Sequence, residues 1–114
     1  MSEASDVIIV YCTVPDADTG QHIARHLVEY RLAACVNLLP GVTSTYRWQD
    51  KVETDTEALL MIKARSAGYA QLESAIRSQH PYELPEIIAV PVTDGLGEYL
   101  DWVRTIHTTD NGVL

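Results

Sequence analysis

A thiol and an imidazole, Cys12 and His80, are the two side chains of this 114-residue chain best suited to binding a metal. Thiolate and imidazole are preferred ligands of soft or borderline cations such as copper and zinc. Two ligands leave a site incomplete, so Glu83, Glu86, a water molecule or a neighbouring subunit would have to complete it. The alternative is structural: Cys12 is then a small buried apolar side chain, and His80 is a residue whose positive form suits a helix C-terminus.

A second candidate metal site is formed by His22 and His26, which stand four residues apart on the polar face of a predicted helix, with Asp18 one turn earlier. Histidines at this spacing can chelate copper or nickel. The pattern lacks the glutamate and the third ligand of a metalloprotease helix. The alternative is that both side chains are simply solvated, because nothing in the sequence encloses the pair.

Catalytic interpretations of the same residues are incomplete. Cys12 and His80 resemble a nucleophile and its base, but no orienting Asn or Asp and no oxyanion loop accompanies them. Glu83 and Glu86 resemble paired carboxylates, but the prolines in the segment 81–86 indicate a stiff connector. There is no glycine-rich phosphate loop. We therefore expect a protein that is not an enzyme.

The net charge and the composition argue against two classes of partner, nucleic acids and membranes. The net charge of −8 and the pI of about 4.7 repel phosphate backbones, so we expect no nucleic-acid partner. No segment approaches the roughly 18 consecutive apolar residues of a membrane-spanning helix, so we expect no membrane partner either. The N-terminus contains Glu3 and Asp6 and lacks the basic start of a signal peptide, which predicts a cytoplasmic location.

The elements that must position these side chains form one α+β domain over residues 1–114. Runs of β-branched and apolar residues predict strands, and apolar residues at helical spacing predict helices. The order is strand 7–12, helix from 16 or 18 to 31, strand 34–48 interrupted at 40–41, strand 52–64, helix 66–79, strand 87–92 and a last helix after 97. This βαββαβ order predicts a ferredoxin-like antiparallel sheet of strand order 4-1-3-2, with an extra C-terminal helix whose apolar stripe includes Tyr99, Trp102 and Val103.

The hairpin made by the second and third strands is unusually long. Each arm has about 14 residues, against the usual 5–6 for a strand, so its end should overhang the body. Alternation in the outer half of the third strand predicts that Glu53, Asp55 and Glu57 are exposed. Unpaired strand edges need a partner, and the simplest partner is a second copy of the chain. The alternative is a bulge or break at residues 40–41 that lets the hairpin curl back.

The same topology brings Cys12 and His80 together. Cys12 lies near the end of the first strand, and His80 follows the second helix into the neighbouring fourth strand. The hairpin turn, residues 49–51, is at this end as well. Cys35 begins the second strand at the opposite end and two strands away, so no disulfide joins the cysteines.

Several stretches resemble one family closely, the divalent-cation tolerance proteins CutA. They occur in the family order over nearly the whole chain, and they are Thr13-Val14-Pro15-Asp16, Leu32-Ala33-Ala34-Cys35-Val36-Asn37, Pro40-Gly41-Val42-Thr43-Ser44, Tyr46-Arg47-Trp48, Lys63, His80-Pro81-Tyr82-Glu83-Leu84-Pro85-Glu86-Ile87 and Tyr99-Leu100-Asp101-Trp102. The resemblance implies a homotrimer joined through long hairpins and tolerance of divalent metals, chiefly copper, in the cytoplasm. The proposed metal ligands of the family map onto Cys12 and His80.

The chain departs from the family pattern at two points. Gln79 stands where some members carry a second histidine before His-Pro, which removes a third potential ligand. Trp48-Gln49-Asp50-Lys51 stands where the family usually has Trp-x-Gly-Lys, so the left-handed position of the turn must accept an aspartate.

Three functional hypotheses remain open. The first is a copper-binding trimer that serves metal tolerance or homeostasis, with Cys12 and His80 as ligands. The second follows from the family's similarity to the PII signalling proteins: a regulator that binds a small molecule or a partner protein in an intersubunit cleft. The third is a structural trimer with incidental metal binding. Besides His80, the candidate cleft residues or secondary ligands are Trp48, Lys63, Tyr82, Glu83 and Glu86.

Overall fold

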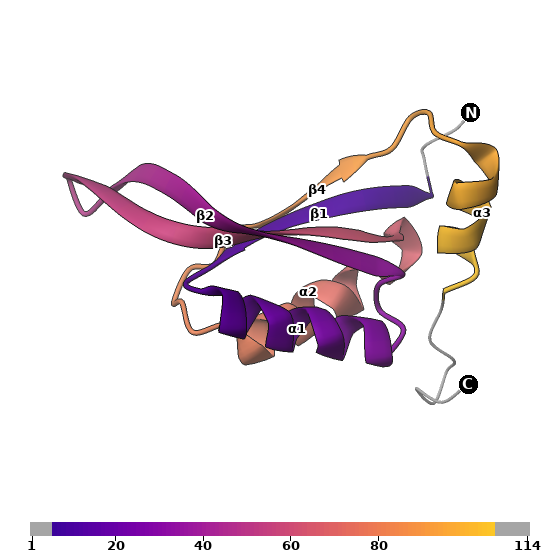
Figure 1. The fold of residues 1–114 in the computed structure, drawn as a ribbon, viewed down its shortest axis with the longest axis horizontal. Helices are drawn as coiled ribbons and strands as arrows, with labels where there is room; N and C mark the ends of the chain where they lie inside the picture. The colour runs from indigo at the N-terminus through magenta and orange to yellow at the C-terminus, as the bar shows by residue number, and fades with distance from the viewer. Residues whose placement is uncertain (1–5, 107–114) are drawn as a thin grey trace.

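Four antiparallel strands form one sheet in the computed structural model, which describes residues 6–106 (Figure 1). The predicted domain, residues 1–114, extends beyond these residues at both ends. The elements in order are β1 (Val7–Val14), α1 (Ala17–Glu29), β2 (Cys35–Trp48), β3 (Lys51–Arg65), a 3-10 turn (Ser66–Gly68), α2 (Tyr69–Gln79), β4 (Ile87–Pro91) and α3 (Gly97–Arg104). The strand order β2-β3-β1-β4 is the predicted 4-1-3-2 order counted from the opposite edge, so the ferredoxin-like prediction is confirmed.

The main core lies between the sheet and the two helices α1 and α2, which cover the same face (Figure 1). Alternate residues of β1 point toward the helices, as the period of a strand requires. The fully buried side chains of this core include Val10, Cys12, Val14, Ile23, Leu27, Leu60, Ile62, Leu72 and Ile76. Because the first strand and the first helix both contribute, the core fixes the end of β1 relative to the start of α1.

The start of α1 is set by a side-chain cap. The carboxylate of Asp16 accepts a hydrogen bond from the backbone N–H of Thr19 at 2.8 Å, and this bond lowers the pKa of the Asp16 carboxyl group. One turn later, Gly20 lets the helix approach the sheet closely. A Cβ at Gly20 would lie 2.9 Å from Leu38 Cδ1 and 3.0 Å from Val14 Cγ2, so a larger side chain would push the helix away.

The hairpin formed by β2 and β3 overhangs the helical layer (Figure 1). Its pairing runs from Cys35 opposite Lys63 to Trp48 opposite Lys51. Only Gln49 and Asp50 lie between the last pair, and both have positive φ angles, 52° and 68°. Positive φ at both central residues is the signature of a type I′ turn, whose twist matches that of the flanking strands. The hairpin overhang was predicted correctly, and Asp50 takes the left-handed conformation usually assigned to glycine.

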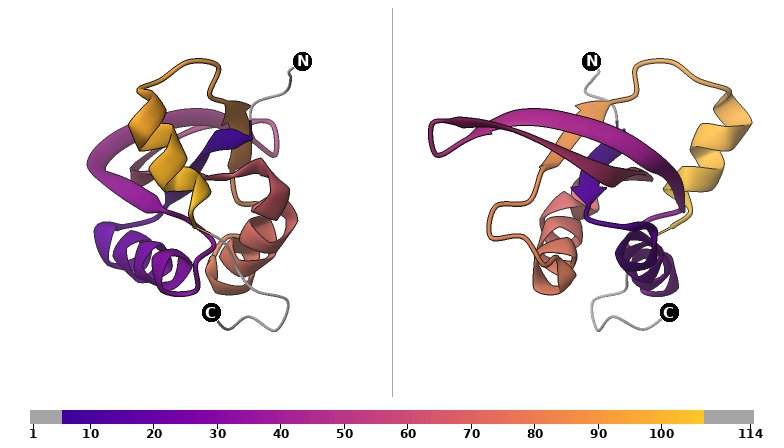
Figure 2. Two further views of the ribbon diagram at one scale, coloured as in Figure 1. Left: turned by 90° about the vertical axis from the view of Figure 1, so that its right-hand side faces the viewer. Right: turned by 60° about the vertical axis from the view of Figure 1, so that its left-hand side comes forward.

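The interruption at residues 40–41 is a β-bulge inside a continuous strand. Leu39 pairs with Leu59 and Val42 pairs with Glu57, so two residues of β2 oppose one residue of β3. Gly41 has a φ of 73°, a conformation that other residues adopt only with strain. A bulge increases the bend and twist of its strand, and the hairpin is curved (Figure 2).

Two details differ from the sequence-based expectation. The helix expected from residue 66 begins with the 3-10 turn, and the α-helix starts only at Tyr69. In α3, which packs at the sheet end opposite the hairpin tip, Val103 is buried but Tyr99 and Trp102 are largely exposed. Their rings contact each other, with centroids 5.6 Å apart, whereas Leu100 and Val103 of α3, and Ile106 just after it, pack with Val7, Ala34 and Val92. No helix within residues 6–106 is long and apolar enough to cross a membrane.

Candidate functional site

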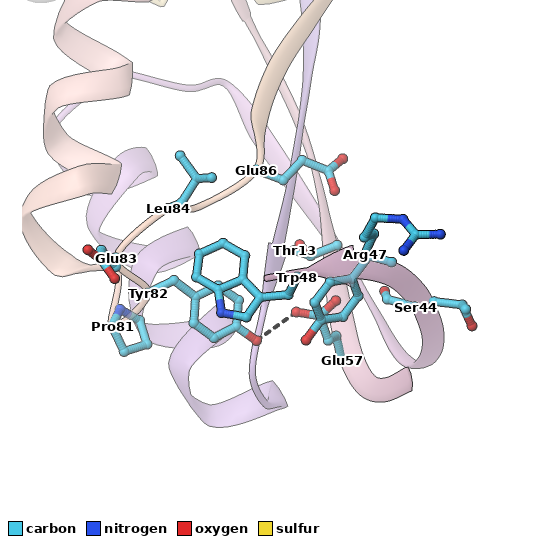
Figure 3. Close-up of a pocket in the computed structure, with 12 residues that line it drawn as sticks. Thr13, Ser44, Arg47, Trp48, Glu57, Pro81, Tyr82, Glu83, Leu84 and Glu86 are labelled. Atoms are coloured by element: carbon cyan, nitrogen blue, oxygen red, sulfur yellow. Dashed lines mark hydrogen bonds between the residues drawn. The ribbon is translucent and has the colours of Figure 1, made fainter. Parts of the chain in front are cut away.

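A cleft of about 750 Å³ lies between the overhanging hairpin and the connector of residues 80–86, which joins α2 to β4 (Figure 3). Its walls come from the end of β1, from both hairpin strands and from the connector. The lining residues are Thr13, Ser44, Thr45, Tyr46, Arg47, Trp48, Glu57, Pro81, Tyr82, Glu83, Leu84 and Glu86. Four of the predicted cleft residues, Trp48, Tyr82, Glu83 and Glu86, are therefore brought together at one site.

Lys63, the fifth predicted cleft residue, does not line this cleft. It pairs with Ile9 and Cys35 in the sheet, near the end opposite the hairpin tip, and its ammonium donates to the side-chain oxygen of Asn37. Lys63 and Glu57 share one face of β3, but six residues at about 3.3 Å each separate them by roughly 20 Å. Within one chain, Lys63 is too far away to contact a ligand held at Glu57.

His80 ties the connector to the end of β1. Its ring Nδ1 accepts a hydrogen bond from the backbone N–H of Tyr82 at 3.1 Å, which places the ring proton on Nε2. The Nε2–H group therefore donates to the carbonyl oxygen of Thr13 at 2.7 Å. The imidazole is neutral in this arrangement, it is 9% exposed, and both of its nitrogens are engaged. His80 thus fixes where the connector leaves α2 and begins to form the cleft wall.

Tyr82 connects that wall to the hairpin. Its hydroxyl donates to Glu57 Oε2 at 2.6 Å (Figure 3), and its ring packs on His80 with centroids 4.7 Å apart. Burial and the hydrogen bond to Glu57 raise the pKa of the Tyr82 hydroxyl. Glu57 was predicted to be exposed, and this is wrong, since only 8% of the residue is accessible. The prediction from alternating residues assumes a straight strand with one face in solvent. Here the hairpin bends at the bulge, and Tyr82 covers Glu57.

The hairpin side of the cleft is aromatic and acidic. Tyr46 and Trp48 stand on the same face of β2 as the partner of Glu57, Val42, because residues two apart share a face. The hydroxyl of Tyr46 donates to Asp55, and this hydrogen bond raises the pKa of Tyr46 to about 12. Trp48 is 41% exposed, so its ring is available to a ligand. The cleft therefore offers ring faces and carboxylates next to one another.

Cys12 lies behind this site, within the core. The residue is completely inaccessible, and burial raises the pKa of its thiol to about 12, with further contributions from the charges of Glu86 and Glu57. The thiol is thus protonated at neutral pH. Cys12 precedes Thr13, the residue whose carbonyl accepts from His80, so the predicted proximity of the two elements is present.

The predicted metal ligands do not form a ready metal site in this arrangement. A copper ion bound by Cys12 and His80 would have to displace the thiol proton and at least one hydrogen bond of His80. No three His, Cys, Asp or Glu side chains within residues 6–106 lie close enough to hold one ion. The assignment of this pair as ligands stays a prediction.

The remaining candidates lie apart from the cleft. His22 is exposed on α1, and His26 packs on the ring of Tyr30 with centroids 4.5 Å apart. No third ligand accompanies them in the described part of the chain. Both cysteines, Cys12 and Cys35, are free thiols, as predicted.

Comparison with known proteins shows to which family the chain belongs. The model of the CutA1 divalent ion tolerance protein matches residues 8–106. The chain belongs to this family. A divalent-cation tolerance protein CutA of Thermus thermophilus is 48% identical over 96 residues, which are 84% of this chain and 93% of the relative. A human CutA protein is 48% identical over 100 residues, 88% of this chain but only 56% of the longer human protein. The family name supports a relation to divalent-metal tolerance.

Solved CutA structures share the fold. The crystal structure of CutA from Xylella fastidiosa superimposes with a TM-score of 0.87 at 48% identity, and the match covers 90% of this chain and all of that one. This agreement confirms the resemblance found in the sequence motifs.

Sequence reasoning did not identify Glu57, Thr13 and Arg47 as cleft residues. For Glu57 a signal existed: once the hairpin register is fixed, it falls on the face that carries Tyr46 and Trp48. For Thr13 no side-chain signal exists, because its contribution is a backbone carbonyl.

Proposed function

We propose that this CutA chain is a copper-binding protein of metal tolerance that acts as a cytoplasmic homotrimer. The observation that carries the proposal is that His80 bonds to the residue next to Cys12 at the end of β1, where the charges of two carboxylates also act. His80 contacts the residue after Cys12, and the charges of Glu57 and Glu86 act on the Cys12 thiol. These groups come from three different parts of the fold, and together they create an anionic environment that attracts a cation.

A trimer supports this function because one chain supplies an incomplete ligand set. The edge strand β4 exposes Ile88 (54%) and Val90, and the hairpin exposes Val52. Exposed apolar edge strands favour pairing with another copy of the chain. A neighbouring subunit at the hairpin would bring further donors to the cleft and cover these side chains.

Competition titration tests the copper site. Reduced protein is titrated with Cu(I) and with Cu(II) against a chelator, in the wild type, in Cys12→Ser and in Cys35→Ser. Cys35→Ser is the matched control, because Cys35 is also a free thiol but begins β2 at the far end of the sheet. We expect tight binding that is lost in Cys12→Ser and retained in Cys35→Ser. Equal binding by all three proteins would refute Cys12 as a ligand.

A second candidate function is a PII-like regulator that binds a small molecule or a partner in the cleft. The favouring observation is the size of the cleft, since about 750 Å³ with aromatic walls suits an organic ligand better than a bare ion. This function predicts a rise in melting temperature with a metabolite in the presence of a metal chelator. Lys63 would reach the ligand only from a neighbouring copy. A trimer that responds to neither metal nor metabolite would instead favour the structural hypothesis.

A further inference from the structure

We propose that the cleft binds an organic cation, namely an ammonium or guanidinium group carried on an apolar stem, with Glu57 as its counter-ion. This inference rests on the cleft being a ligand site, as in the second candidate function, and it does not depend on copper.

The first argument is the state of Glu57. The residue is more than nine-tenths buried, and its carboxylate accepts a hydrogen bond from the neutral hydroxyl of Tyr82. Among residues 6–106, Glu57 forms no ion pair. Buried carboxylates are rare unless they are paired, because desolvation of an ionised group costs several kcal/mol. A carboxylate also offers about four acceptor positions, of which Tyr82 fills one. Glu57 therefore has both the charge and the free acceptor capacity to hold a cation.

The second argument is that aromatic rings line the cleft. Tyr46, Trp48 and Tyr82 line the same cleft, and cations are attracted to the faces of such rings. The hydroxyls of Tyr46 and Tyr82 already donate to Asp55 and Glu57, so a ligand meets their rings rather than their hydroxyls. An apolar stem packs on these rings while its ammonium reaches Glu57.

The third argument is selectivity by charge. Glu57, Glu83 and Glu86 line the cleft, against one cationic side chain, Arg47. Arg47 leaves β2 from the face opposite Tyr46, since successive residues of a strand alternate. An anionic ligand would meet three carboxylates, whereas a cation is attracted by all three. A hydrated metal ion gains little from aromatic walls, which distinguishes the organic cation from the metal.

Phenethylamine is a suitable probe, because it joins a primary ammonium to an aromatic stem. Phenethyl alcohol is its uncharged counterpart of similar size. Binding is followed by amide chemical shifts of the intact protein in the presence of EDTA, so that the result is independent of any metal. We expect phenethylamine to shift the amides of Glu57, Tyr82 and Trp48, and phenethyl alcohol to bind about tenfold more weakly, because it lacks the charge-assisted hydrogen bond.

Two variants and one control variant test which cleft side chains bind phenethylamine. Glu57→Gln keeps an acceptor for Tyr82 but removes the charge, and it should weaken phenethylamine binding by about tenfold. Glu98→Gln changes the net charge equally on the exposed first turn of α3, away from the cleft, and should leave binding unchanged. Trp48→Leu, at the exposed end of the hairpin, tests the ring without entering the core, and it should weaken binding severalfold.

The outcomes are decisive in both directions. Loss of binding in Glu57→Gln but not in Glu98→Gln, together with discrimination against the alcohol, establishes an organic-cation site. If Glu57→Gln does not fold, Trp48→Leu and the alcohol comparison carry the test. Equal binding of amine and alcohol, or no binding at millimolar amine, overturns the proposal. Because EDTA is present throughout, failure here leaves the copper titration unaffected, and failure of copper binding leaves this result unaffected.

Discussion

Replacing His80 by alanine should lower the free energy of unfolding by about 2–4 kcal/mol. The imidazole makes two hydrogen bonds, one to the Thr13 carbonyl at 2.7 Å and one from the Tyr82 N–H at 3.1 Å. Each such bond contributes roughly 0.5–1.5 kcal/mol net, and a poorly satisfied buried carbonyl costs roughly 1–3 kcal/mol. Without His80, the side-chain donor left to the Thr13 carbonyl is the weak Cys12 thiol at 3.7 Å. Thr13 is nearly as buried as His80, so water does not easily replace the lost donor.

The assay is equilibrium unfolding in guanidinium chloride at one fixed protein concentration, because association with other copies would make stability depend on concentration. His22→Ala is the matched control. It removes the same side chain from the exposed face of α1, and surface changes of this kind stay within roughly 0.5 kcal/mol. If His80→Ala were as harmless as His22→Ala, the tie between β1 and the connector would contribute nothing, and the structural role given to His80 would be wrong.

Three further perturbations test other parts of the structure. Tyr82→Phe removes the donor to buried Glu57 and should cost about 1–3 kcal/mol, whereas Tyr30→Phe, on a largely exposed side chain, should be nearly neutral in the same unfolding assay. Gly41→Ala places a side chain at a φ of 73° and should cost about 1–2 kcal/mol, whereas Gly68→Ala, at a negative φ, should not. The folded-state pKa of the Cys12 thiol, about 12, lies above its unfolded value of roughly 8.5. The folded chain therefore binds this proton more tightly, so stability is complete below about pH 8.5 and falls as the pH rises toward 12. Cys12→Ala should reduce that slope by about one proton, and an unchanged slope would contradict the burial argument.

The fold could be predicted because its signals are local. The β-branched run of β1, the helical spacing of Ile23 and Leu27, and the long alternating arms around Gln49 and Asp50 each specify an element without reference to the rest of the chain. The order of these elements then leaves few topologies. A bulge or break at residues 40–41 was only the alternative to an overhanging hairpin, and the register shows that the hairpin both contains a bulge and stays continuous.

The site was predicted only in part, because its contacts join distant segments. His80 binds the backbone of a residue 67 positions earlier, and Tyr82 covers a carboxylate 25 positions earlier. Strand alternation placed Glu57 in solvent, and no local pattern shows that a connector folds over it. The sequence could bring Cys12 and His80 to one end of the fold, but it does not show that both imidazole nitrogens bond to the protein's own backbone.

Native mass spectrometry of the protein after addition of stoichiometric copper under reducing conditions tests the central proposal most directly, since it reports subunit number and bound metal together. The proposed function predicts one species of about 38 kDa, three times the 12.7 kDa chain, that retains copper through desalting. A copper-free assembly, or a chain that stays monomeric at micromolar concentration, would contradict it.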